Sequence, residues 1–163
     1  MAQRDYGFNM PFGLPGGIYD LSPKMVLTRT LDSGSSVKPG MGLVKGATGG
    51  ETVKAVESGS TAPDFEGIFV NGSKQLEHGA NGTAAVGADT VGVMMEGHIW
   101  GLVVSTAKIT YGGAVALITD GDNAGWFTDS TDSAETSKVS LTGATFTGVK
   151  DADNKIAVIK LRK

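Results

Sequence analysis

One apolar stretch, residues 86–104, constrains the fold of this chain more than any other part of its sequence. Val91, Val93 and Met95 alternate with smaller or polar residues, and a second apolar run ends at Val104. This alternation is typical of a β-strand, and Gly97 between the two runs can supply the positive φ of a tight turn. We therefore predict a β-hairpin that reverses at residues 96–98 and lies at the centre of a sheet.

A glycine-containing turn that leads into valine occurs three times, at residues 39–44, 86–91 and 111–115. The unequal spacing argues against a solenoid, in which the period is fixed. Glycine is also abundant, with 25 of the 163 residues, about twice the usual share. Frequent turns between short strands favour a barrel or a sandwich.

The expected strands cover most of the chain after residue 23, and no segment has the pattern of a helix. They are residues 25–31, 41–44, 52–56, 65–70, 91–95, 99–104, 115–119, 145–149 and 156–161. The length suits one domain. We predict an all-β fold, a small β-barrel or sandwich of short antiparallel strands over residues 24–163, with an acidic loop at about residues 120–138.

Residues 1–23 are expected to form an extended arm, because proline and glycine break every regular pattern there. The arm carries large apolar side chains, which are the candidate partner-binding residues: Tyr6, Phe8, Met10, Phe12, Leu14, Ile18 and Tyr19. A solvated linker would be polar. Two interpretations stay open, since these side chains would be buried either on another protein or on the barrel of the same chain.

The composition argues against several classes of protein. The net charge is −3 and the only basic cluster is residues 160–163, so nucleic-acid binding is disfavoured. The absence of cysteine rules out disulfides and thiolate metal sites. No run of about 18 apolar residues exists, and no signal-like segment begins the chain, so we expect a soluble protein made in the cytoplasm without a membrane partner.

No catalytic or metal-binding motif is expected. Residues 120–125 resemble the start of a calcium loop, but Ala124 stands where an oxygen ligand is needed, and Thr131 stands where a bidentate glutamate is expected. His78 and His98 are the only histidines; His78 lies in a polar segment, and His98 is expected to be an exposed turn residue. We therefore expect no enzyme, no cofactor and no metal.

The two tryptophans suggest one alternative function. Trp100 and Trp126 would suit stacking on a sugar, as in a carbohydrate-binding or adhesin-like β-domain on a virion or cell surface. The stronger interpretation places Trp100 in the core or in a subunit contact, and has Trp126 and Phe127 anchor the acidic loop. A hydrolase is a third and weaker alternative.

Several short segments occur in an order that resembles a known family. They are Gly13–Ile18, Thr28–Thr30, Val37–Gly40, Phe65–Ile68, Gly87–Val91, Gly97–Val103, Gly112–Val115 and Ile156–Leu161. In this order they resemble the cement, or decoration, proteins of tailed-bacteriophage heads. The resemblance implies a small β-barrel that assembles as a homotrimer on the exterior of the mature capsid. There it would clamp neighbouring major capsid protein subunits, after synthesis in the host cytoplasm.

Overall fold

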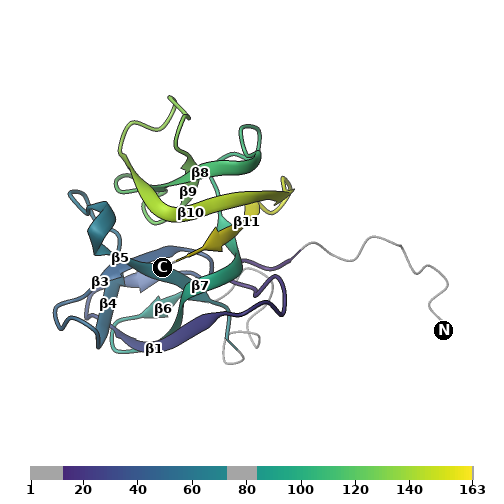
Figure 1. Cartoon of the computed structure of the whole chain (residues 1–163). Coiled ribbons are helices and arrows are strands. Elements are labelled where there is room, and N and C mark those ends of the chain that lie inside the picture. The colour runs from purple at the N-terminus through teal and green to yellow at the C-terminus, as the bar shows by residue number, and fades with distance from the viewer. Residues whose placement is uncertain (1–12, 73–83, 163) are drawn as a thin grey trace, which may run out of the picture.

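The computed structural model describes residues 13–72 and 84–162. Within these ranges the chain forms strands joined by turns, and a single 3-10 turn, η1 (Ala62–Asp64), is its only helical element (Figure 1). The strands are β1 (Met25–Leu31), β2 (Ser36–Val37), β3 (Gly42–Lys45), β4 (Thr52–Ala55), β5 (Phe65–Val70), β6 (Ala85–Val86), β7 (Thr90–Leu102), β8 (Tyr111–Ile118), β9 (Phe127–Asp129), β10 (Lys138–Asp151) and β11 (Ile156–Leu161). The all-β prediction is confirmed. No helix in these ranges has the length and hydropathy needed to cross a membrane.

Strand β7 is the centre of the sheet, but it is not a hairpin. It runs through 13 residues without reversing, and Gly97 lies inside it with a φ of +124°. Before Gly97 the strand pairs with β1 and β5, and from Gly97 onward it pairs with β11. The predicted turn at residues 96–98 is therefore wrong, because a positive φ at glycine also fits a strand that bends and changes partners.

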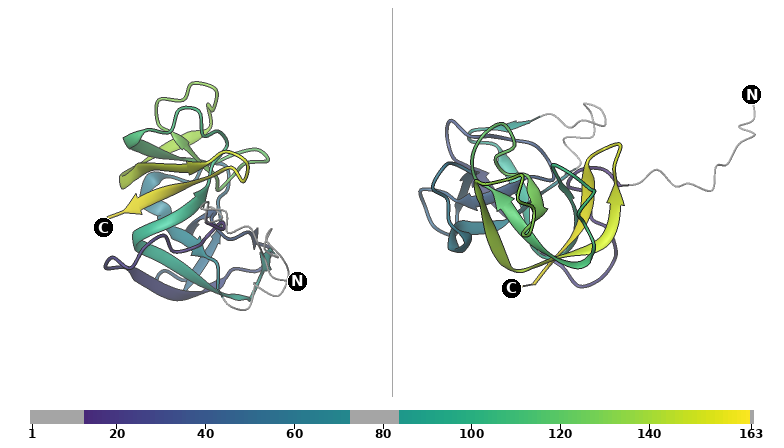
Figure 2. Two further views of the ribbon diagram at one scale, coloured as in Figure 1. Left: turned by 90° about the vertical axis from the view of Figure 1, so that its right-hand side faces the viewer. Right: turned by 90° about the horizontal axis from the view of Figure 1, so that it is seen from above.

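Two closed circuits of strands share β7. The first runs through β1, β4, β3 and β5 to β7, which pairs with β1 again and closes a barrel. The second runs from β7 through β11, β10 and β8 to β9, and the bridge between Val103 and Phe127 closes it. Figures 1 and 2 show β8–β11 stacked above the strands of the first circuit. The predicted barrel is confirmed, in a form with two halves.

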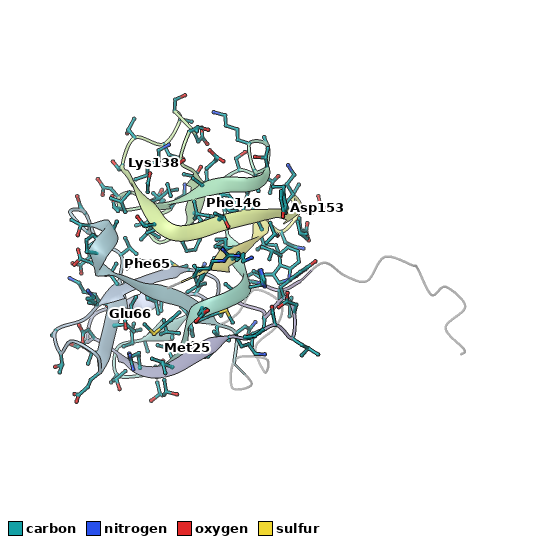
Figure 3. The ribbon with its side chains drawn as sticks, in the orientation of Figure 1. Met25, Phe65, Glu66, Lys138, Phe146 and Asp153 are labelled. Carbon is teal, nitrogen blue, oxygen red and sulfur yellow. The ribbon has the colours of Figure 1, made fainter. Side chains whose placement is uncertain are left out.

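The core runs continuously from one half into the other. Leu43, Phe69 and Val93 fill the first barrel. A larger cluster includes Met94 from the first circuit together with Phe127 from the second. Figure 3 labels Phe65 below and Phe146 above this junction. Phe146 belongs to the larger cluster, and Phe65 packs on it.

Most of the predicted strands occur within two residues of their expected limits. Strand β8 begins earlier, at Tyr111, because Gly112 and Gly113 lie within the strand instead of forming a turn before it. Phe127 anchors the 120–138 segment as expected, since it is completely buried and lies in β9. Strand β10 covers Lys138–Asp151 and is much longer than the predicted strand at residues 145–149, so it begins at the end of that segment.

Candidate functional site

The last part of the expected arm lies along the second half of β7. The Trp100 amide donates to the Gly17 carbonyl at 2.9 Å, and the Tyr19 amide donates to the His98 carbonyl at 3.0 Å. Between these two hydrogen bonds, Ile18 forms an isolated antiparallel β-bridge with Ile99. Residues 13–19 thus add an extended stretch beside β7. The other arm candidates, Tyr6, Phe8, Met10 and Phe12, lie outside the described residues.

Trp100 is the side chain on which this stretch packs. The Tyr19 and Trp100 rings meet edge to face, with centroids 5.8 Å apart. Trp100 is only 5% exposed, which confirms its expected place in the core. Trp126 is half-buried against the cluster that contains Trp100. A side chain as buried as Trp100 leaves no open ring face for a sugar.

A strip of exposed apolar side chains follows the chain from residue 14 to residue 26. Six of the eight large hydrophobic side chains exposed in the described residues belong to it: Leu14, Ile18, Tyr19, Leu21, Met25 and Val26. We call this set the apolar strip; Figure 3 labels Met25, at the start of β1. Such concentrations of exposed apolar surface mark interaction sites.

The sequence identified only half of the apolar strip as candidate binding residues. Leu14, Ile18 and Tyr19 were expected, whereas Leu21, Met25 and Val26 were missed. Leu21 is 96% exposed and stands between two polar residues, so no apolar pattern in the sequence marks it. Alternation in 25–31 predicted a strand there, yet it does not reveal that apolar residues at the start of the strand stay exposed. The apolar run Met25–Leu27 could have indicated it. Successive side chains of a strand point to opposite faces, so this run places apolar side chains on both faces of the strand.

Leu21 is displayed on a short bulge, residues 20–23. On one side of the bulge Tyr19 is bonded to His98, and on the other side Met25 pairs with Glu96. The chain is therefore bonded to β7 both before and after the bulge, and residues 20–23 loop outward between these two paired stretches. The bulge leaves Leu21 the most exposed side chain of the strip.

His98 holds this bulge in place. Its Nδ1 lies 3.0 Å from Asp20 Oδ2 and 2.9 Å from the Ser22 hydroxyl oxygen. The hydrogen bond from Ser22 and the neighbouring His98 lower the pKa of Asp20 below its ordinary value. His98 lies inside β7, and only 20% of its side chain is exposed. The prediction of an exposed turn residue is therefore wrong, and its cause is the missing hairpin.

Ser22, His98 and Asp20 are the residue types of a hydrolytic triad, but their geometry differs from one. In a triad the serine and the acid contact opposite nitrogens of the imidazole. Here both contacts fall on Nδ1, so a proton cannot pass through the ring from Ser22 to Asp20. His78 lies outside the described residues. In the ranges that the structure covers, no three His, Asp or Glu side chains form a group that could hold a metal.

Comparison with known proteins identifies the family of this closed β-fold. The sequence matches the family described as structural cement protein (E217 gp24/Pam3 gp6) over residues 1–162. The chain belongs to this phage cement protein family. It is a structural protein of the phage virion with a capsid-stabilising role, as the resemblance predicted.

The fold of this cement protein is also found among solved structures. A chain in the structure titled "The capsid of Myoviridae Phage XM1" superposes with a TM-score of 0.73, with 99% of each chain covered. The two sequences are 17% identical, so this likeness concerns the fold. None of the curated proteins matches the chain in sequence.

Proposed function

We propose that this cement protein binds the outside of the capsid through its N-terminal arm and the apolar strip, and that it clamps neighbouring major capsid protein subunits. The observation that carries the proposal is the concentration of exposed large hydrophobic side chains in residues 14–26. Four of the six side chains of the strip belong to the last part of the arm, and Met25 and Val26 follow it directly in β1. Arm and strip together would form one continuous binding surface.

The physical gain lies in removing this apolar surface from water. Burial of one large apolar side chain contributes about 1.5–3 kcal/mol before ordering costs. Leu21 has the most to gain, because 96% of its surface is exposed. The contacts of His98 with Asp20 and Ser22 hold the bulge in advance, so less ordering of the backbone opposes binding. Leu21 is therefore the expected anchor of the strip.

The arm residues Tyr6, Phe8, Met10 and Phe12 are proposed to extend the same contact. Ordering an extended arm costs about 1–2 kcal/mol per residue, which offsets much of the gain from its side chains. The net binding free energy of one copy is therefore modest. Many copies on a symmetric shell add up to a large stabilisation of the head.

We also propose that the protein acts without catalysis and as a homotrimer. The placement of Ser22 and Asp20 on one nitrogen of His98 supports the first statement. The second rests on apolar surface that a monomer leaves exposed and on the closed symmetry that is common among oligomers. Native mass measurement of the purified protein, and its copy number on heads, test the trimer. Single isolated copies in both would contradict it.

Binding to heads that lack the protein tests the proposed surface. Removal of residues 1–12 leaves Gly13 and the contacts with Trp100 intact, so the fold should persist while affinity falls at least tenfold. Leu21→Ser should weaken binding by a similar factor. Val86→Ser is the matched control, because Val86 is 55% exposed but lies on β6, outside the strip. Unchanged affinity of both the truncated protein and Leu21→Ser would refute the proposal.

A further inference from the structure

A hollow of about 460 Å³ opens on the outer face of the second barrel. The lining side chains used below are His98, Tyr111, Thr145, Lys160 and Arg162. They come from β7, β8, β10 and β11 and from the residue that follows β11. We call it the cationic hollow.

The register of the sheet fixes how these side chains stand. Lys160 pairs with His98 on one side and with Thr145 on the other. Residues directly opposite each other on adjacent strands share one face of the sheet. Arg162 lies two residues beyond Lys160, and its amide donates to the Gly143 carbonyl at 2.8 Å. Phe146, next to Thr145, is buried in the core, so the row with Lys160 faces outward.

Neither Lys160 nor Arg162 forms a salt bridge in the described part of the chain. The salt bridges found there join other residues: Arg29 with Glu66, Lys54 with Glu57, His98 with Asp20, and Lys108 with Asp132. The chain carries 17 acidic and 14 basic residues, so acids are not scarce. Lys160 faces His98 across the strands, and Asp20 is already bonded to that imidazole. An anionic partner would supply the counter-charge that Lys160 and Arg162 lack.

The cationic hollow borders the apolar strip through one residue. Nδ1 of His98 holds the 20–23 bulge that displays Leu21, and the same ring lines the hollow. Tyr111 stands at the hollow, 88% exposed, and its phenol offers a further hydrogen-bond donor. A partner that covers the strip would therefore meet two basic side chains and donor groups immediately beside it.

We infer that the cationic hollow receives an acidic segment of the same capsid protein that covers the apolar strip. The inference rests on the proposed function, and it adds the chemistry of the partner: an apolar contact flanked by Asp or Glu side chains. Two basic side chains and a histidine neutralise too few phosphates for nucleic-acid binding, whereas they match a few carboxylates. Arginine is well suited to such a contact, since its guanidinium binds a carboxylate through two parallel hydrogen bonds.

Charge reversal tests this assignment. The double variant Lys160→Glu, Arg162→Glu is compared with the control Lys38→Glu, Lys155→Glu, which has the same net charge but changes exposed side chains away from the hollow. Affinity for undecorated heads is measured over a series of NaCl concentrations. We expect the hollow variant to bind at least tenfold more weakly at low salt and the control to bind within threefold of the wild type. Affinity of the wild type should fall with salt more steeply than that of the hollow variant.

A neutral pair of substitutions separates charge from folding. Lys160→Gln, Arg162→Gln should keep the melting transition of the wild type and bind with intermediate affinity. Equal binding of the charge-reversed variant and its control would overturn the inference. So would a change in the oligomeric state of the hollow variant in solution, with unchanged affinity per copy, because the occupant would then be a second copy of this chain. Loss of binding in Leu21→Ser, with unaltered binding in the hollow variant, would support the proposed function. It would refute the inference that the hollow receives an acidic segment.

Discussion

Gly13 lies against the indole ring of Trp100, so closely that a Cβ atom on Gly13 would come within 1.9 Å of Nε1. No side chain fits at this position unless the backbone or the ring moves. The contact fastens residues 13–19 to β7 at the point where residues 1–12 of the arm end. A glycine in the middle of an apolar arm is thus required by packing, in addition to any freedom it gives the chain.

We predict that Gly13→Ala displaces residues 13–19 from Trp100. The expected loss in the free energy of unfolding is about 1–3 kcal/mol, the usual cost of forcing a methyl group into a filled site. Urea denaturation followed by circular dichroism measures it. Gly49→Ala is the control, because a Cβ on Gly49 has no atom within 4 Å. Equal stability of the two variants would show that Gly13 does not pack on the ring in solution.

The bend in β7 gives a second prediction. Gly97 has a φ of +124°, which side chains rarely tolerate, and a Cβ there would lie 2.8 Å from the Cβ of Lys24. Gly97→Ala should therefore destabilise the fold by about 1–3 kcal/mol through backbone strain, with more from the close contact. Gly92→Ala in the same strand is the control, since its Cβ would meet Val26 and Val70 at an ordinary 3.6 Å. Thermal unfolding of both variants at one pH checks the difference.

The sequence predicted the strands well and their connection poorly. Apolar runs bounded by turn residues are a local signal, and they identified β1, β5 and β11 from their residues alone. Whether Gly97 reverses the chain or only bends it depends on which strands flank β7, and these lie far away in the sequence. The role of His98 was missed for the same reason, because its partners Asp20 and Ser22 are 76 or more residues away.

The binding surface was predictable only in part. Apolar residues among prolines and glycines indicated the arm, and Leu14, Ile18 and Tyr19 do lie exposed beside β7. Leu21 could not be selected, because exposure on a bulge is set by the pairing of Tyr19 and Met25 with β7. The cationic hollow was not predicted either. Lys160 and Arg162 appeared as an isolated basic end of the chain until the sheet register placed His98 and Thr145 beside them.

Acid should weaken the contact that holds residues 130–137. Lys108 Nζ lies 2.7 Å from Asp132 Oδ1, and the Ala134 amide donates to the same oxygen at 3.1 Å. The hydrogen bond from Lys108 is the main reason that the pKa of Asp132 lies below its ordinary value of 3.8. Because the folded pKa is the lower one, the unfolded chain binds more protons in acid. Stability from this contact is present above about pH 4 and is lost as pH falls through the folded pKa.

Asp132→Asn tests this dependence. The variant should be less stable at pH 7 by about 1–3 kcal/mol, since Lys108 loses its charged partner at a carboxyl that is almost fully buried. Its stability should also fall less steeply between pH 5 and pH 3 than that of the wild type. Some slope should remain, because the pKa values of Asp20 and Asp64 are lowered as well. Asp122→Asn, at an exposed position, should reproduce the wild-type curve.

The last prediction concerns Phe127, which closes the second barrel. Its side chain is completely buried, its ring meets Phe65 edge to face at 6.3 Å, and its carbonyl accepts from the Val104 amide at 3.1 Å. Phe127→Ala should cost about 3–5 kcal/mol, the range for removing a buried aromatic ring. It should also increase hydrogen exchange in β9, because the ring is what fixes this short strand between β8 and the end of β7.

Trp126→Ala is the matched comparison for Phe127. Trp126 is larger but only half-buried, so its removal leaves a smaller unfilled space and should cost about half as much. The backbone bond from the Ile118 amide to the Trp126 carbonyl, at 2.9 Å, remains in both variants. Guanidinium denaturation of the two variants gives the comparison directly. A loss for Trp126→Ala equal to or greater than that for Phe127→Ala would mean that the acidic segment is anchored from outside the barrel and not through its core.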